Sequence, residues 1–173
     1  MAELVITAIG PDRPGLVDEF TGALLDAGGN VADSRMMHLR GEFAMMLLTE
    51  VDDGAVDSVS SALKQAGESI GLSVTITLQQ TASSPASGVT FRLRISAMDK
   101  PGIVHRITHL LHERCVNIEE LETNLEPGAY GGTPQFTMSL CMTVPADVEV
   151  QQLHGDLQSL CDSINCDVDM EPV

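Results

Sequence analysis

The chain has 173 residues, of which 43% are hydrophobic but only 3% aromatic, so a packed interior has to be built from aliphatic side chains. Its 25 acidic residues outnumber 9 basic residues and give a formal net charge of -16. A surface this negative repels phosphate groups, which argues against direct binding to nucleic acid and to anionic membranes.

The first half of the chain predicts the element order β-α-β-β-α-β. Residues 3–10 form a short, β-branched apolar run bounded by glycine, which is typical of a buried strand. A one-sided apolar stripe begins at Leu16 and predicts a helix that ends at Gly28 and Gly29. The remaining elements are strands at 30–39 and 42–51, a helix marked by Val56, Val59, Leu63 and Ala66, and a strand at 72–78.

A polar, proline-containing linker follows, and after it the same order of elements begins again. We predict a first domain at 1–80, a linker at 81–88 and a second domain at 89–173. The second set of elements comprises strands at 89–98, 117–125, 135–144 and 165–170 and helices at 101–114 and 149–162.

The two halves are copies related by a fixed offset. An offset of 87 residues carries Asp12 onto Asp99, whereas beyond the predicted hairpin Phe43 corresponds to Phe136 at an offset of 93. The difference is a six-residue insertion in the second hairpin. It falls within residues 126–134, which are rich in glycine and proline and hold the only tyrosine of the chain.

This repeated order predicts an α+β fold of two tandem ferredoxin-like domains, each a four-stranded antiparallel sheet with its helices on one face. The other sheet face has to be polar or covered, and the run at 44–48 is apolar on both of its alternating faces. We therefore expect a second sheet or subunit to cover it. Small aliphatic domains often gain stability by pairing, which favours a homodimer or a higher homo-oligomer.

Each copy has the same corner between its first strand and its first helix. Residues 12–17 read DRPGLV and residues 99–104 read DKPGIV. We predict that Asp12 and Asp99 are helix N-caps, because an N-cap carboxylate accepts from a first-turn backbone N–H and proline is tolerated in that turn. The glycine leaves the remaining N–H groups uncovered. The corner is therefore either a well-capped helix start or a receptor for a small carboxylate.

The element order, the repeated D-[RK]-P-G-[LI]-V corner and the asparagine that opens the second strand resemble ACT domains, which are amino-acid-sensing regulatory modules. The resemblance covers both halves, and the free-standing pair is similar to the glycine cleavage system transcriptional repressor family. It implies an effector bound at an interface between modules. The matching positions are Gly15, Leu16 and Asn30 in the first copy and Gly102, Ile103 and Asn117 in the second.

The resemblance implies a non-enzymatic, amino-acid-sensing regulator without a cofactor, with glycine or serine as its effector. A repressor-type protein would act by contacting a transcription activator, and the negative charge agrees with contact to protein and not to DNA. The alternative is a ligand-free partner subunit of an enzyme of amino-acid or one-carbon metabolism. A small enzyme is a third interpretation, but the sequence has no nucleophile elbow, phosphate loop or dinucleotide motif.

Two other groups of side chains have both a functional and a structural interpretation. His105, His109 and His112 share one face of a predicted helix and point away from its apolar stripe, which favours solvated histidines over a metal site. The methionine pairs at 36–37 and 45–46 are interpreted as hairpin core, with an adaptable binding surface as the alternative.

The cysteines and the start of the chain predict a reducing, cytoplasmic compartment. All four cysteines fall in the second half and none forms a C-x-x-C pair. No charged-then-apolar leader precedes the first predicted strand, and no apolar run is long enough to span a bilayer. Cys161 and Cys166 flank the last helix-to-strand turn and are interpreted as core thiols, with a contact between them as the alternative.

Overall fold

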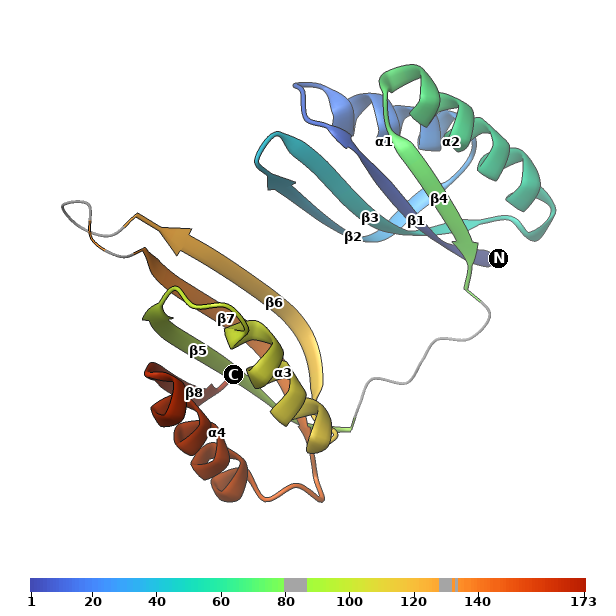
Figure 1. The fold of residues 1–173 in the computed structure, drawn as a ribbon. Helices are drawn as coiled ribbons and strands as arrows, with labels where there is room; N and C mark the ends of the chain where they lie inside the picture. Colours follow the sequence, from blue (N-terminus) through green and yellow to red (C-terminus); the bar gives the residue numbers. More distant parts are fainter. Residues whose placement is uncertain (80–86, 128–131, 133) are drawn as a thin grey trace. The chain divides into compact units, whose positions relative to one another are not determined.

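The computed structural model describes residues 1–79, 87–127, 132 and 134–173. The chain divides into two compact units, Met1–Ser83 and Ser84–Val173, and each has the predicted order of elements (Figure 1). The prediction of an α+β fold with two tandem ferredoxin-like domains is therefore confirmed. The exact domain limits stay a prediction, because most of the linker predicted at 81–88 lies outside the described residues. Gly88, which was assigned to that linker, begins a strand.

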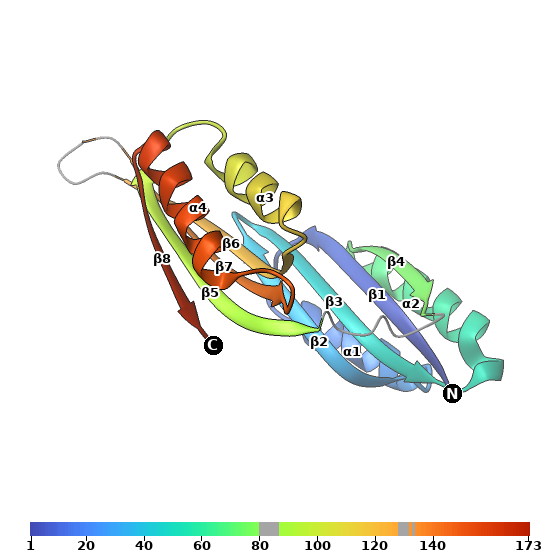
Figure 2. The ribbon, with the colours of Figure 1, turned by 90° about the horizontal axis from the view of Figure 1, so that it is seen from below.

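The first unit is a four-stranded antiparallel sheet in the order β2-β3-β1-β4, with two helices against one face, as Figure 1 and the turned view in Figure 2 show. Its strands are β1 (Ala2–Pro11), β2 (Asn30–Leu39), β3 (Glu42–Val51) and β4 (Ser73–Leu78). Its helices are α1 (Leu16–Asp26) and α2 (Val56–Ile70). Strand alternation explains the layering, because every second residue of β3, including Phe43, Met45 and Leu47, is buried beneath the helices.

The second unit repeats this topology with the strand order β6-β7-β5-β8. Its strands are β5 (Gly88–Met98), β6 (Asn117–Glu126), β7 (Gln135–Pro145) and β8 (Cys166–Pro172), and its helices are α3 (Ile103–Glu113) and α4 (Val150–Ile164). The registers also repeat: β2 shifts register between Val31 and Asp33, and β6 shifts between Ile118 and Glu120. The insertion predicted at 126–134 lies mostly outside the described residues.

Each unit has its own aliphatic core between the sheet and the helices. Phe20 on α1 and Ile107 on α3 occupy the same repeat position, and both are 0% exposed. Burying a side chain of this size stabilises a fold by about 1.5–3 kcal/mol. The one-sided apolar stripes read from the sequence are thus the inner faces of the helices.

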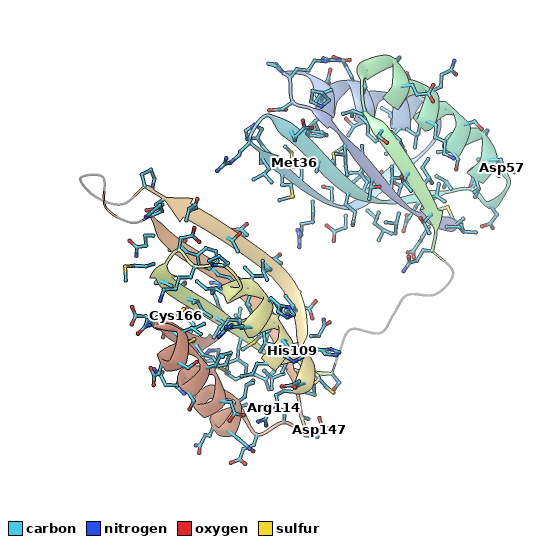
Figure 3. The ribbon with its side chains drawn as sticks, in the orientation of Figure 1. Met36, Asp57, His109, Arg114, Asp147 and Cys166 are labelled. Atoms are coloured by element: carbon cyan, nitrogen blue, oxygen red, sulfur yellow. The ribbon has the colours of Figure 1, made fainter. Side chains whose placement is uncertain are left out.

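The interpretation of the methionine pairs as hairpin core is wrong for three of the four side chains. Met45 is buried, but Met36, Met37 and Met46 are 59%, 58% and 52% exposed. β2 is an edge strand that is exposed along its whole length, and Figure 3 shows Met36 on it. Met46 belongs to the sheet face opposite the helices, because its neighbours Met45 and Leu47 are the ones that face the core.

Candidate functional site

Both corner helices begin directly after a glycine. α1 starts at Leu16 and α3 starts at Ile103, and the preceding Gly15 and Gly102 each have a φ of 93°. Glycine adopts this left-handed conformation readily, whereas residues with a side chain do not. The Asp-base-Pro-Gly sequence therefore forms a turn that is complete before the helix begins.

The prediction that Asp12 and Asp99 are helix N-caps is wrong. Each lies three residues before the glycine that occupies the N-cap position, and among the described residues neither carboxylate accepts from the first helical turn. The backbone N–H of Asp12 donates to the Gly41 carbonyl at 2.8 Å, and Asp12 Oδ2 lies 3.5 Å from His38 Nε2. The prediction failed because it placed the proline inside the helix, while the positive φ of the glycine keeps it outside.

The first corner is occupied by its own side chains. The Arg13 guanidinium donates two hydrogen bonds to the Glu19 carboxylate, from Nη1 to Oε1 at 2.7 Å and from Nη2 to Oε2 at 2.8 Å. Glu19 Oε1 lies 3.2 Å from the point where a Cβ on Gly15 would stand. The hydrogen bonds from Arg13 lower the pKa of Glu19, so an ionised carboxylate already stands beside this helix N-terminus. An incoming carboxylate would meet a like charge there.

The second corner has the same backbone with a different charge pattern. Lys100 stands where the first copy has Arg13, and Arg106 stands where it has Glu19. Apart from the chain neighbours of Gly102, no atom of the described residues lies within 4 Å of its Cβ position. No carboxylate in the described part of the chain pairs with Lys100 or Arg106. As far as residues 1–79, 87–127, 132 and 134–173 show, the second corner is therefore an open helix N-terminus with two cationic side chains in its sequence. The sequence analysis missed this difference, although the 87-residue offset between positions 19 and 106 signals it.

The residues that follow the two glycines can offer only their backbone to a ligand. Leu16 and Ile103 are 2% and 4% exposed, and their side chains belong to the two cores. The first backbone hydrogen bond of α1 is donated by the N–H of Glu19 to the Gly15 carbonyl, and that of α3 by the N–H of Arg106 to the Gly102 carbonyl. The N–H groups before them have no helical carbonyl to bind and are the available donors.

The predicted asparagines do not lie at the corner of their own unit. Asn30 opens β2 and pairs with Glu50, whereas the first corner follows Pro11, which pairs with Glu42 at the other end of β3. Asn117 occupies the same place at the start of β6. Within one unit, the corner and the asparagine therefore lie at opposite ends of the sheet.

The histidines of α3 are all exposed, as their helical spacing predicted. The rings of His105 and His109 stack with centroids 5.8 Å apart, and His109 Nε2 lies 3.5 Å from Glu113 Oε1. Figure 3 shows His109 on the α3 helix. Among the described residues, no group of three histidine, cysteine or acidic side chains is placed to hold a metal ion. None of the described helices has the length and apolar character needed to cross a bilayer.

Cys161 and Cys166 are free thiols within the second core, which confirms their interpretation as core residues. Burial, with a smaller contribution from the neighbouring Cys166, raises the pKa of Cys161 to about 11. Burial also raises the pKa of Cys166. Both thiols are therefore neutral at physiological pH and lack the thiolate character of a nucleophilic cysteine.

Comparison with known proteins agrees with this architecture. The profile described as the ACT domain matches residues 2–77. A UPF0237 protein of Methanopyrus kandleri is 35% identical over 78 residues, which are 44% of this chain and 87% of that protein. The chain belongs to the ACT-domain family. The glycine cleavage system transcriptional repressor of Escherichia coli (strain K12) is 26% identical over 162 residues, which are 94% of this chain and 85% of that protein.

A solved structure extends the similarity of this ACT-domain protein to both units. The crystal structure of an unknown protein from Galdieria sulphuraria superposes with a TM-score of 0.88 at 30% identity, covering 99% of this chain and 98% of that chain. The expectation of a tandem ACT-domain protein similar to the glycine cleavage system transcriptional repressors is thus confirmed.

Proposed function

We propose that this tandem ACT-domain protein is a non-enzymatic regulator that binds a small amino acid and signals through protein contacts. The similarity to a protein named glycine cleavage system transcriptional repressor, along 94% of the chain, supports a regulatory role. The net charge of -16 disfavours direct contact with DNA, so the partner is a protein such as a transcription activator. We expect this function in the cytoplasm.

The observation that carries the proposal is the open second corner. In the described part of the chain, no atom beyond its chain neighbours lies within 4 Å of the Cβ position on Gly102, and Lys100 and Arg106 flank it in sequence. An amino-acid carboxylate there would accept from the backbone N–H groups of Gly102 and Ile103 and gain from the helix dipole and the cationic side chains. The first corner, at Gly15 and Leu16, is the weaker site because Glu19 already occupies it.

The position of the asparagines ties ligand binding to assembly. Since Asn30 and Asn117 lie at the far ends of their own sheets, either one reaches a corner only from a neighbouring module. A side-chain amide can accept from the ligand ammonium group, which would complete recognition of a zwitterion such as glycine or serine. Ligand would then stabilise one packing of modules over another, and this population shift would present or hide the partner surface. A homodimer or a higher homo-oligomer provides such an interface.

Calorimetric titration with glycine, serine and the other common amino acids tests the proposal. We expect one of them to bind, and we expect both Lys100→Gln and Arg106→Gln to weaken binding because each removes a positive charge from the corner. Gly102→Val should abolish it, with circular dichroism as the check that the variant folds. If no amino acid binds to the folded protein, or if the charge variants bind as the unchanged protein does, the corner is not the receptor.

Glu19→Gln gives a second test with the opposite sign. Removing the carboxylate charge from the first corner should create or strengthen binding there, since the backbone of the two corners is the same. Glu68→Gln is the matched control, because it removes one exposed negative charge from α2. Equal effects of the two variants would show that only the overall charge matters.

One observation favours the second candidate, a ligand-free partner subunit of a metabolic enzyme. The Arg13–Glu19 pair fills the first corner with the chain's own side chains. An absence of heat with every amino acid, together with co-purification of an enzyme of amino-acid or one-carbon metabolism, would support that role.

A further inference from the structure

Each unit also has a hollow on the sheet face opposite its helices. In the second unit a cavity of about 270 Å³ is lined by Arg92 and Arg94 of β5, Glu120 and Glu122 of β6, and Ser139 and Cys141 of β7. In the first unit a cavity of about 240 Å³ is lined by residues that include Val5 of β1, Asp33 and Arg35 of β2, and Met46 and Leu48 of β3. The offsets of 87 and 93 residues carry six of the seven lining residues of the first hollow onto lining residues of the second, and only Ser34 and Arg94 have no counterpart in the other lining. The hollow is therefore a repeated feature of this face.

The strand registers explain why the hollow forms. On the second sheet, Arg92 pairs with Cys141 and Cys141 pairs with Glu120, which makes one row across the sheet. The next row holds Arg94, Ser139 and Glu122. The small β7 side chains form a floor between two walls of long side chains, and the walls stand about 10 Å apart because two strand spacings separate them.

The two walls carry opposite charges. Arg92 and Arg94 form the cationic wall on β5, and Glu120 and Glu122 form the anionic wall on β6. Behind the arginines, β8 brings acidic residues into the same rows, and Arg94 Nη1 lies 3.1 Å from Glu171 Oε1. That pair is about half exposed, so its geometry can be exchanged for a ligand contact at little cost.

This charge pattern selects the class of ligand. A simple anion would meet the arginines but also the flanking glutamates, and a simple cation would meet the glutamates but also two arginines. A molecule with both charges satisfies both walls at once, because guanidinium groups bind a carboxylate in a paired geometry and carboxylates accept from an ammonium group. We propose that the hollow on the second sheet, lined by Arg92, Arg94, Glu120 and Glu122, is a binding site for a small zwitterion such as a free amino acid.

The first unit supplies an internal comparison. Val5 and Thr7 replace the two arginines there, and Leu48 and Met46 replace Cys141 and Ser139 on the floor. That hollow has Asp33 and Arg35 on β2 but no cationic residue on its central strand, and its floor is apolar, so we expect it not to bind a zwitterion. The site is separate from the helix corners, and its binding does not depend on the function proposed above.

The test uses the full chain labelled with nitrogen-15, and glycine is the probe because it is the smallest zwitterionic amino acid. Glycine should shift the amide signals of residues 92–94, 120–122 and 139–141 in a saturable way. Acetate and methylammonium, each carrying one of the two charges, should not do so at the same concentration. The equivalent amides of the first unit should stay unchanged.

Variants separate this site from the corner. Arg92→Gln and Arg94→Gln should each raise the dissociation constant for these shifts roughly tenfold or more, the effect of removing a charge-assisted hydrogen bond. Lys64→Gln removes one positive charge from an exposed position of α2 and is the matched control. Arg106→Gln should weaken any shifts at Gly102 and leave those at the sheet unchanged, so the two sites can fail independently.

Cys141 allows a second measurement, since it forms part of the floor and is half-buried. In a Cys115→Ser background, which removes the exposed thiol, glycine should slow the alkylation of Cys141 by iodoacetamide. Three outcomes overturn the proposal: no sheet shifts with glycine, equal shifts with acetate alone, or unchanged binding by both arginine variants. A fourth outcome also overturns it: shifts that depend on protein concentration without glycine would show that a second copy of the chain covers the face.

Discussion

The buried thiol of Cys161 makes the stability of the second unit depend on pH in a defined window. Cys161 is 0% exposed, and burial raises its pKa from 9.0 to about 11. An acid whose pKa is raised by folding stabilises the fold below its unfolded pKa, and this stability is lost as the pH rises through the folded pKa. The unfolded chain releases the proton near pH 9, whereas the folded chain holds it until about pH 11.

The size of the effect follows from the two pKa values. Each unit of pKa difference corresponds to about 1.4 kcal/mol, so a difference of about two units gives a loss of roughly 2.7 kcal/mol above both values. Halfway through the window, near pH 10, the loss is about 1.4 kcal/mol. A loss of this size is a large fraction of the stability of a small domain.

Urea unfolding at a series of pH values between about 8 and 10.5 measures the effect, with a reducing agent present and the amide signals of β5 to β8 as the readout. Cys161→Ala should be less stable at low pH but should lose less stability on going to high pH. Cys115→Ser, which changes an exposed thiol, should follow the unchanged protein. If Cys161→Ala and the unchanged protein lose the same free energy of unfolding across the window, burial of this thiol does not raise its pKa.

Two further predictions concern the core side chains and the glycines within two helices. Phe20→Ala should destabilise the first unit by about 3–5 kcal/mol, and Ile107→Ala should destabilise the second by about 2–5 kcal/mol. Urea unfolding followed separately for each unit should show that each substitution leaves the free energy of unfolding of the other unit unchanged. A loss of stability in the unit that was not changed would contradict two independent cores. In α2, a Cβ on Gly67 would lie 2.3 Å from Val74 Cγ2, so Gly67→Ala should destabilise by about 1–3 kcal/mol. Gly155 on α4 has no atom of another described element within 4 Å of its Cβ position, so Gly155→Ala should stabilise by up to about 1 kcal/mol, and the thermal unfolding temperatures of the two variants should move in opposite directions.

Hydrophobic periodicity predicted the elements because each helix buries one stripe and each core strand alternates. The strands at 30–39 and 42–51 were predicted at their observed bounds. The N-caps of the two corner helices were not predicted correctly, since an Asp-base-Pro-Gly sequence can form either the first turn of a helix or a turn before it. Only the φ of 93° at Gly15 and Gly102 decides between these alternatives.

The exposed methionines show a second limit of sequence reasoning. Met45 and Met46 are neighbours of the same type, yet one is buried and the other is 52% exposed. Which of them faces the core depends on the register of β3, and an apolar run on both faces does not reveal it. The charge difference between the corners, by contrast, was readable, because alignment of the two copies places Glu19 opposite Arg106.

The divergence of the two sheet faces has a consequence for how the chain folds during synthesis. Tandem copies of one topology are prone to misassembly, in which a strand of one copy enters the sheet of the other. β5 carries Arg94 beside the acidic β8, and β1 carries Thr7 at the equivalent position. A β1 strand that entered the wrong sheet would leave Glu171 without its arginine, which disfavours the mispaired product by up to about 1 kcal/mol because the pair is half exposed.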